Sequence, residues 1–92
     1  MTAARRFILA PGVLAQASLP EAILLDARAG RYFAANPVAT ALLRALLAGA
    51  DEAAMLATLR QQFEADEEVL RADVLACLDD WVGRGLIVVV PD

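Results

Sequence analysis

Few side chains in this sequence have the chemistry that catalysis requires. Histidine and lysine are absent, and all eight basic residues are arginines. The one cysteine, Cys77, lies on an apolar stripe at helical spacing, where a thiol more often packs as a small hydrophobic group than acts as a nucleophile. The serine and the threonines have no base near them in the sequence, and the acidic pairs Glu67–Glu68 and Asp79–Asp80 point apart on a helix. We therefore expect no catalytic residue and no enzymatic activity.

The sequence also lacks the residues that hold metals and cofactors. With one cysteine and no histidine, a zinc site would need mostly carboxylate ligands, which is unusual. No glycine-rich phosphate-binding loop is present, so nucleotide binding is unsupported. We expect neither a metal nor a cofactor.

Charge and hydropathy restrict the partners. The net charge is −4, from 12 acidic and 8 basic residues, and no basic patch is available to displace counterions from nucleic acid. No apolar run approaches the length that spans a bilayer. A lone cysteine excludes an internal disulfide, so a cytoplasmic protein is the simplest interpretation.

The N-terminal residues permit a second interpretation. Arg5–Arg6, an apolar stretch from residue 7 to 15, and Ala15-Gln16-Ala17 imitate a signal peptide with a small-residue cleavage site. Pro11-Gly12 interrupts the apolar stretch, and cleavage would remove residues that the pattern assigns to a strand. For residues 5–17 we favour a strand region over a processed segment, without excluding the latter.

The first third of the chain has the pattern of short strands. We predict strands near residues 13–17, 22–26 and 31–35, with a turn at Ser18-Leu19-Pro20. The second and third runs are separated by a few residues that end in Gly30, which is typical of a hairpin. Gly30 would supply the positive φ that such a loop needs.

The pattern changes to helical spacing at Asn36-Pro37, a favoured N-cap followed by a favoured first helical residue. We predict helices near residues 37–48, 52–63 and 67–82, with Gly49 ending the first and Asp51 capping the second. The β-branched run at residues 86–90 suits a final short strand. The order predicts an α+β fold of the winged helix-turn-helix class, a three-stranded antiparallel sheet followed by three helices, forming a single domain over residues 1–92.

A sheet of three strands has exposed edges, which a protein must either blunt or use. The run from Arg31 to Ala35 has no proline and one charge, so an extended peptide could add to it as a further strand. By alternation, only one of Tyr32 and Phe33 should face the core. The other would be available to a ligand or to a covering helix.

Residues 24–37, with the sequence LLDARAGRYFAANP, resemble the strand-turn-strand signature of PqqD-like proteins. These proteins are also called recognition elements of ribosomally synthesised, modified peptides. Phe63, residues 71–74 and residues 85–87 resemble later parts of the same pattern. The resemblance covers roughly residues 12 to 88. Ala35 departs from it, because the family often has leucine before the asparagine, and this leaves a smaller apolar contact where sheet meets helix.

The resemblance implies a non-catalytic adaptor that binds the leader segment of a precursor peptide, laid as a strand in the cleft between the third strand and the third helix. It is strongest to the stand-alone proteins of lasso-peptide biosynthesis, which work beside a separate leader peptidase and a cyclase. A PqqD-type chaperone for a radical-SAM enzyme is the alternative. A DNA-binding regulator fits the fold less well, because the third helix is acidic. The expected peptide-binding residues are Arg31, Tyr32, Phe33 and Ala34 on the strand, and Val69, Ala72, Asp73 and Ala76 on the helix.

Overall fold

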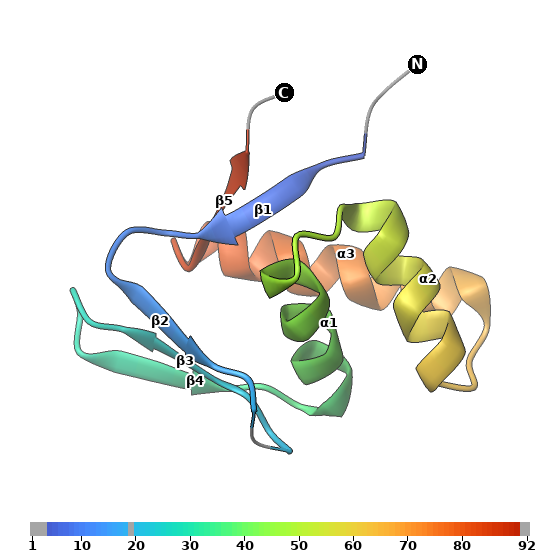
Figure 1. Ribbon diagram of the computed structural model, residues 1–92, viewed down its shortest axis with the longest axis horizontal. Helices are drawn as coiled ribbons and strands as arrows, with labels where there is room; N and C mark the ends of the chain where they lie inside the picture. Colours follow the sequence, from blue (N-terminus) through green and yellow to red (C-terminus); the bar gives the residue numbers. More distant parts are fainter. Residues whose placement is uncertain (1–3, 19, 91–92) are drawn as a thin grey trace.

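The computed structural model describes residues 4–18 and 20–90 and contains two small sheets and three helices (Figure 1). The elements in chain order are β1 (Arg6–Leu9), β2 (Val13–Gln16), β3 (Ile23–Asp26), β4 (Arg31–Ala34), α1 (Pro37–Leu47), α2 (Glu52–Gln62), α3 (Glu67–Gly83) and β5 (Ile87–Val90). The expected α+β winged helix-turn-helix architecture is confirmed: an antiparallel sheet of β2, β3 and β4 precedes the three helices.

The three-stranded sheet is a meander in which β3 lies between β2 and β4. Leu24 of β3 faces Ala15 on one side and Phe33 on the other. The turn between β3 and β4 ends at Gly30, whose φ of 65° lies in the left-handed region that favours glycine. The predicted hairpin and the role of its glycine are both confirmed.

Two of the helices begin at side-chain caps that the sequence predicts. The Asn36 side chain accepts a hydrogen bond from the Ala39 amide at 2.8 Å, and Pro37 occupies the first turn of α1. Asp51 accepts from the Ala54 amide at 2.9 Å at the start of α2. Such caps satisfy amides that have no partner within the helix. α3 begins after Asp66 without a side-chain cap.

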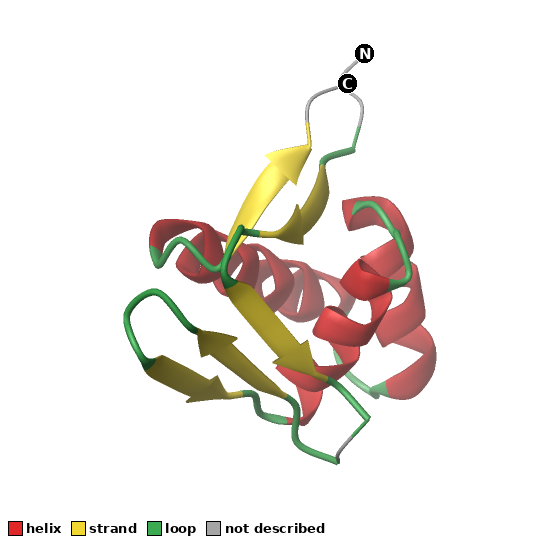
Figure 2. Ribbon diagram, turned by 60° about the vertical axis from the view of Figure 1, so that its left-hand side comes forward, coloured by secondary structure: helices red, strands yellow, loops and turns green. Residues whose placement is uncertain are grey.

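The first strand, β1, was not predicted. It pairs antiparallel with β5, with Phe7 opposite Val89 and Leu9 opposite Ile87. Figures 1 and 2 both place this two-stranded sheet above the three-stranded one. Phe7 is buried in the core, as are Ala10 and Val13. Residues 5–17 are therefore part of the folded structure, as the strand interpretation requires.

The core lies between the inner faces of the sheets and the three helices. It contains Leu24 of β3, Leu42 and Leu43 of α1, and Leu78 of α3, all almost fully buried. Thr40 is the buried polar residue of α1, and its hydroxyl accepts a hydrogen bond from the Ala22 amide at 2.9 Å. This bond ties the start of β3 to the first helix. Within the described residues, no helix is long and apolar enough to cross a membrane.

Candidate functional site

The open edge of β4 is the first component of the candidate site. Among the described residues, β4 pairs with β3 on one side and with no strand on the other. The Ala35 amide donates to the Ala22 carbonyl at 2.8 Å, and hydrogen-bonded pairs alternate along an antiparallel ladder. Phe33 and Arg31 therefore bond to β3. The amides and carbonyls of Tyr32 and Ala34 point to the open edge, where they are available for hydrogen bonds with an added strand.

The side chains of β4 divide between the two faces of the sheet. Phe33 points inward and packs against the core, beside its cross-strand partner Leu24, which is buried. Tyr32 points to the outer face and is 73% exposed. Arg31 shares the inner face with Phe33 but is exposed, and Ala34 shares the outer face with Tyr32. The expected alternation holds, with Phe33 as the inward aromatic.

The second component is a line of side chains on α3, which we call the β4 flank. It starts at Arg84, just after the helix, whose guanidinium lies 5.2 Å from the centre of the Phe33 ring. Asp80 accepts hydrogen bonds from Arg84 Nε at 2.9 and 3.0 Å and so holds the guanidinium in place. At 3.6 residues per turn, Ala76, Asp73 and Val69 continue this line towards the start of the helix.

Of the four helix residues expected in the site, three therefore lie on the β4 flank. Val69 is 52% exposed and apolar, Ala76 is small and exposed, and Asp73 is exposed with no hydrogen bond or ion pair to a described residue. Ala72 is exposed as well, but it lies about 40° further around the axis of α3 than Ala76. Of the four residues it is therefore the furthest from the side of the helix on which Arg84 contacts Phe33. The flank offers a peptide an apolar side chain, a small side chain and one carboxylate.

The β3–β4 hairpin is joined to the residues just after α3 by Arg28. Arg28 Nε donates to Asp26 Oδ1 at 3.0 Å, and Arg28 Nη2 donates to the Gly85 carbonyl at 2.8 Å. The hydrogen bond from Arg28 lowers the pKa of the Asp26 carboxyl below its ordinary value, although burial acts in the opposite direction. The hydrogen bond from Arg28 to Gly85 fixes the position of the β3–β4 hairpin relative to the end of α3.

Cys77 borders the β4 flank but is poorly suited to nucleophilic chemistry. It is half-buried and packs against the core. Burial raises the pKa of its thiol to about 11, and nearby Asp80 acts in the same direction. Because the thiolate is the reactive form, a thiol with this pKa is almost entirely protonated at neutral pH. The structure thus supports the interpretation of Cys77 as a packing residue.

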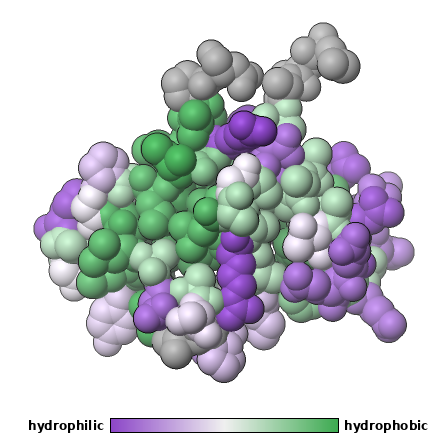
Figure 3. All heavy atoms as spheres, in the orientation of Figure 1, coloured by the Kyte–Doolittle hydropathy of each residue, from purple (hydrophilic) through white to green (hydrophobic). Residues whose placement is uncertain are grey.

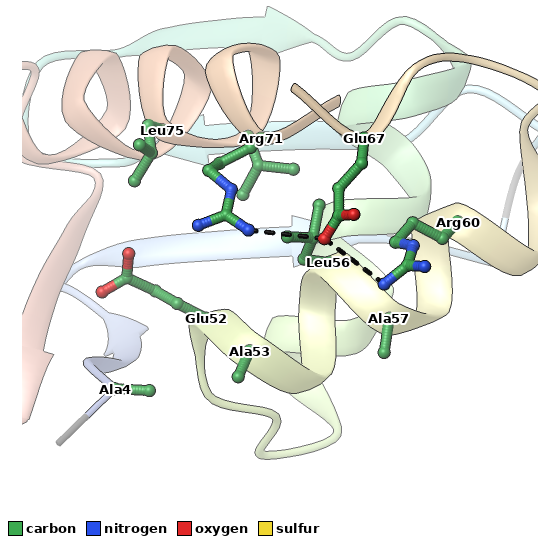
Figure 4. A pocket seen from close by; sticks show the side chains of 10 residues that line it. Ala4, Glu52, Ala53, Leu56, Ala57, Arg60, Glu67, Arg71 and Leu75 are labelled. Atoms are coloured by element: carbon green, nitrogen blue, oxygen red, sulfur yellow. Dashed lines mark hydrogen bonds and ion pairs between the residues drawn. The ribbon is translucent and has the colours of Figure 1, made fainter. Parts of the chain in front are cut away.

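A hollow that was not expected from the sequence lies on the opposite side of α3, against α2 (Figure 4). It encloses about 530 Å³ over an apolar floor that includes Leu56 and Val74. Arg60 and Arg71 both contact Glu67 at its rim, at 3.5 and 3.4 Å. The sequence contains no local signal for this hollow, because its walls belong to two helices whose relative orientation depends on the tertiary packing.

The described part of the chain contains no group of three or more histidine, cysteine, aspartate or glutamate residues arranged to hold a metal ion. It also contains no buried side-chain nitrogen or oxygen without a hydrogen-bond partner. The free edge of β4 and the adjoining flank of α3 are the features that the sequence predicts for peptide binding. Their geometry suits a peptide in extended conformation.

Comparison with known proteins agrees with this geometry. Two solved structures are similar, one described as lasso peptide synthetase B1 complexed with the leader peptide and the other as TbiB1 in complex with the TbiA(beta) leader peptide. The first is 24% identical with a TM-score of 0.81 and covers 90% of this chain and 98% of its own. The second is 18% identical with a TM-score of 0.82 and covers 91% and 98%. At these identities, the similarity establishes the fold.

No curated protein matches the sequence. The family model described as coenzyme PQQ synthesis protein D (PqqD) matches residues 21–87, which include the β3–β4 hairpin and all three helices. This confirms the resemblance of residues 24–37, since they lie within the matched region. The chain belongs to the PqqD family.

Proposed function

We propose that this chain is a non-catalytic adaptor that binds the leader segment of a ribosomally synthesised precursor peptide, of the lasso-peptide class. The leader adds to β4 as a fourth strand and is delivered to a separate leader peptidase or another modifying enzyme. The observation that carries the proposal is the open edge of β4 beside the exposed flank of α3.

The backbone of the leader bonds to Tyr32 and Ala34, whose amides and carbonyls face the open edge. Alternate leader side chains then point inward, towards Phe33, Ala76 and Asp73. The main-chain bonds supply affinity without regard to sequence, and the inward side chains supply selectivity. Arg31, Val69 and Ala72 lie at the borders of this surface.

The comparisons support the class of ligand. Both similar structures are described as complexes with a leader peptide, and the family is described by the synthesis of coenzyme PQQ. That description also favours a second candidate, a chaperone that presents a precursor to a radical-SAM enzyme. The two functions use the same strand and helix and differ in the peptide that is bound.

DNA binding is the competing function for a winged helix-turn-helix fold. On α3 the acidic residues Glu68, Asp73 and Asp79 are exposed. The arginines at either end, Arg71 and Arg84, already contact Glu67 and Asp80. In the major groove, such a helix would meet phosphate repulsion instead of releasing counterions. The charge distribution therefore favours a peptide.

The proposal is tested by fluorescence anisotropy with the labelled leader segment of the precursor encoded beside this gene. We expect saturable binding that a scrambled peptide of the same composition does not reproduce, and no binding to duplex DNA at physiological salt. The purified chain alone should leave the precursor intact when the mixture is followed by mass spectrometry. Equal affinity for the scrambled peptide, or turnover of the precursor, would contradict the adaptor function.

A further inference from the structure

The hollow between α2 and α3 has an apolar floor. Leu56 of α2 is half-buried, Val74 of α3 is buried, and Leu75 of α3 is 38% exposed. Figure 3 shows that polar residues gather around the turn between α2 and α3, whereas apolar ones gather on the strand side of the molecule. The hollow is therefore an apolar surface beside a polar part of the molecule, and the proposed leader site does not use it.

Of the described residues that line the hollow, four are charged. Glu52 is already engaged, because its carboxylate accepts hydrogen bonds from the amide and the guanidinium of Arg5, both at 3.2 Å. At the other end, Arg60 of α2 and Arg71 of α3 reach the same atom, Oε1 of Glu67, at 3.5 and 3.4 Å (Figure 4). Two guanidiniums thus share one carboxylate, which leaves one positive charge in excess.

The contacts of Arg60 and Arg71 with Glu67 are weak ones. Both distances are long for an N–H···O hydrogen bond, and all three side chains are exposed, where an ion pair adds little stability. Each guanidinium has five N–H donors, of which Glu67 takes one. The remaining donors of Arg60 and Arg71 are suited to the carboxylate of a ligand, because guanidinium and carboxylate form paired hydrogen bonds.

The size and the walls of the hollow indicate a small molecule. Its volume of about 530 Å³ lies within the range of roughly 300–1,000 Å³ that is typical of small-molecule sites. Both walls are helices, whose amides and carbonyls bond within the helix, so an extended peptide has no strand edge to pair with. A stable protein interface covers about 800 Å² on each partner, whereas charged side chains bound this apolar floor at both ends (Figure 4).

We propose that the hollow between α2 and α3 is a binding site for a small amphipathic monocarboxylate, a molecule of the fatty-acid class with an aliphatic body and one carboxylate. The aliphatic body lies on Leu56, Val74 and Leu75, and the carboxylate accepts hydrogen bonds from Arg60 and Arg71. A single negative charge matches the single positive charge in excess, so a monocarboxylate suits the site better than a doubly charged phosphate. The inference goes beyond leader binding and does not depend on it, since the site lies on the opposite side of α3.

The probe is decanoate, kept below the concentration at which it forms micelles. It is added to the isotope-labelled full chain while the amide chemical shifts are followed by NMR. We expect saturable shifts at the residues that line the hollow, with the resonances of β4 unchanged. Acetate, which has the carboxylate without the aliphatic body, should not bind measurably. Decanol, which has the body without the charge, should bind at least about fivefold more weakly than decanoate.

Two variants separate the effect of charge from that of space. Arg71→Gln should weaken decanoate binding at least about fivefold, because a hydrogen bond between two charged groups is lost. Arg6→Gln, at an exposed arginine of β1 outside the hollow, is the matched control and should bind normally. Ala57→Trp should fill the hollow from the α2 side and weaken binding at least about tenfold. Ala54→Trp, at an exposed alanine of α2 outside the lining, should leave it unchanged.

The absence of saturable shifts at the hollow would overturn the inference. So would wild-type affinity in a folded Arg71→Gln or Ala57→Trp protein, with the fold checked by circular dichroism. Decanol that binds as tightly as decanoate would show that the arginines play no part, with the same result. Shifts of these resonances with rising protein concentration, or with added leader peptide, would assign the hollow to a second copy or to the peptide and contradict a small-molecule site.

Discussion

The guanidinium of Arg84 lies over the ring of Phe33, 5.2 Å from its centre, and joins the end of α3 to the edge strand β4. A cation over an aromatic face is attracted by the ring, the more so when water is partly excluded. Asp80 keeps the guanidinium in this position. The contact occupies the Arg84 end of the flank, so we expect an incoming side chain to contact the flank nearer Ala76 and Asp73.

The backbone assignment at the open edge predicts a difference between two proline substitutions. Ala34→Pro removes an amide that points to the open edge of β4, and should weaken leader binding at least about tenfold while the β3 ladder stays intact. Ala15→Pro is the matched control on the opposite edge, where the amide of Ala15 points away from β3 because Ala27 bonds to Gly12. Both are read by leader titration with circular dichroism. Equal loss in the two variants would contradict the assignment.

The small, exposed side chain of Ala76 predicts a steric block when it is enlarged. Ala76→Trp should weaken leader binding about 30-fold, because losing one anchor side chain commonly costs about 2 kcal/mol. Ala54→Trp, at an exposed alanine of α2, should bind normally. Fluorescence titration measures both. Unchanged affinity in a folded Ala76→Trp protein would mean that the peptide uses another face of α3.

The contact between Asp26 and Arg28 predicts a pH-dependent contribution to stability. The folded-state pKa of Asp26 is lowered, mainly by the hydrogen bond from Arg28. The contribution is therefore present above the unfolded-state pKa and is lost as the pH falls through the folded-state value. Asp26→Asn should reduce the free energy of unfolding at pH 7, and the difference from wild type should shrink in acid. Urea unfolding across this range tests it, with exposed Asp73→Asn as the control. A difference that persists unchanged at low pH would rule out a charge effect.

The half-buried thiol predicts slow alkylation. With a pKa of about 11 in place of 9.0, the thiolate fraction of Cys77 at pH 8 is about a hundredfold lower than for a free thiol. Iodoacetamide should therefore react about a hundred times more slowly with the folded chain than with the chain in concentrated urea. Cys77→Ala should bind leader normally. Rapid alkylation of the folded protein would show that the thiol of Cys77 is activated, and would contradict its interpretation as an unreactive packing residue.

Local signals predicted most of the fold. The caps Asn36 and Asp51 and the turn at Gly30 each act within a few residues, so the three helices and the three central strands lie within one or two residues of their expected bounds. β1 has no such signal. Its four residues pair with β5 at the other end of the chain, and nothing near Arg6 in the sequence marks a turn towards that partner.

The candidate site was predictable in its parts rather than in its arrangement. Alternation correctly divides Tyr32 from Phe33. Helical spacing groups Val69, Ala72, Asp73 and Ala76 on one side of α3, and their part in peptide binding stays a prediction. The contact of Arg84 with Phe33 and the link from Arg28 to Gly85 depend on tertiary packing. The same holds for the hollow between α2 and α3. These contacts decide which flank of α3 meets the sheet, and no spacing within one element contains that information.

The pairing of β1 with β5 has a consequence for folding during synthesis. Arg6 and Val90 are partners although 84 positions separate them (90 − 6). A contact of such high sequence separation carries a large loop-closure entropy unless the intervening chain is already compact. The three-stranded sheet and the helices, whose contacts are mostly local, can form first. While a ribosome is making the chain, Phe7 therefore stays without its strand partner until β5 has emerged.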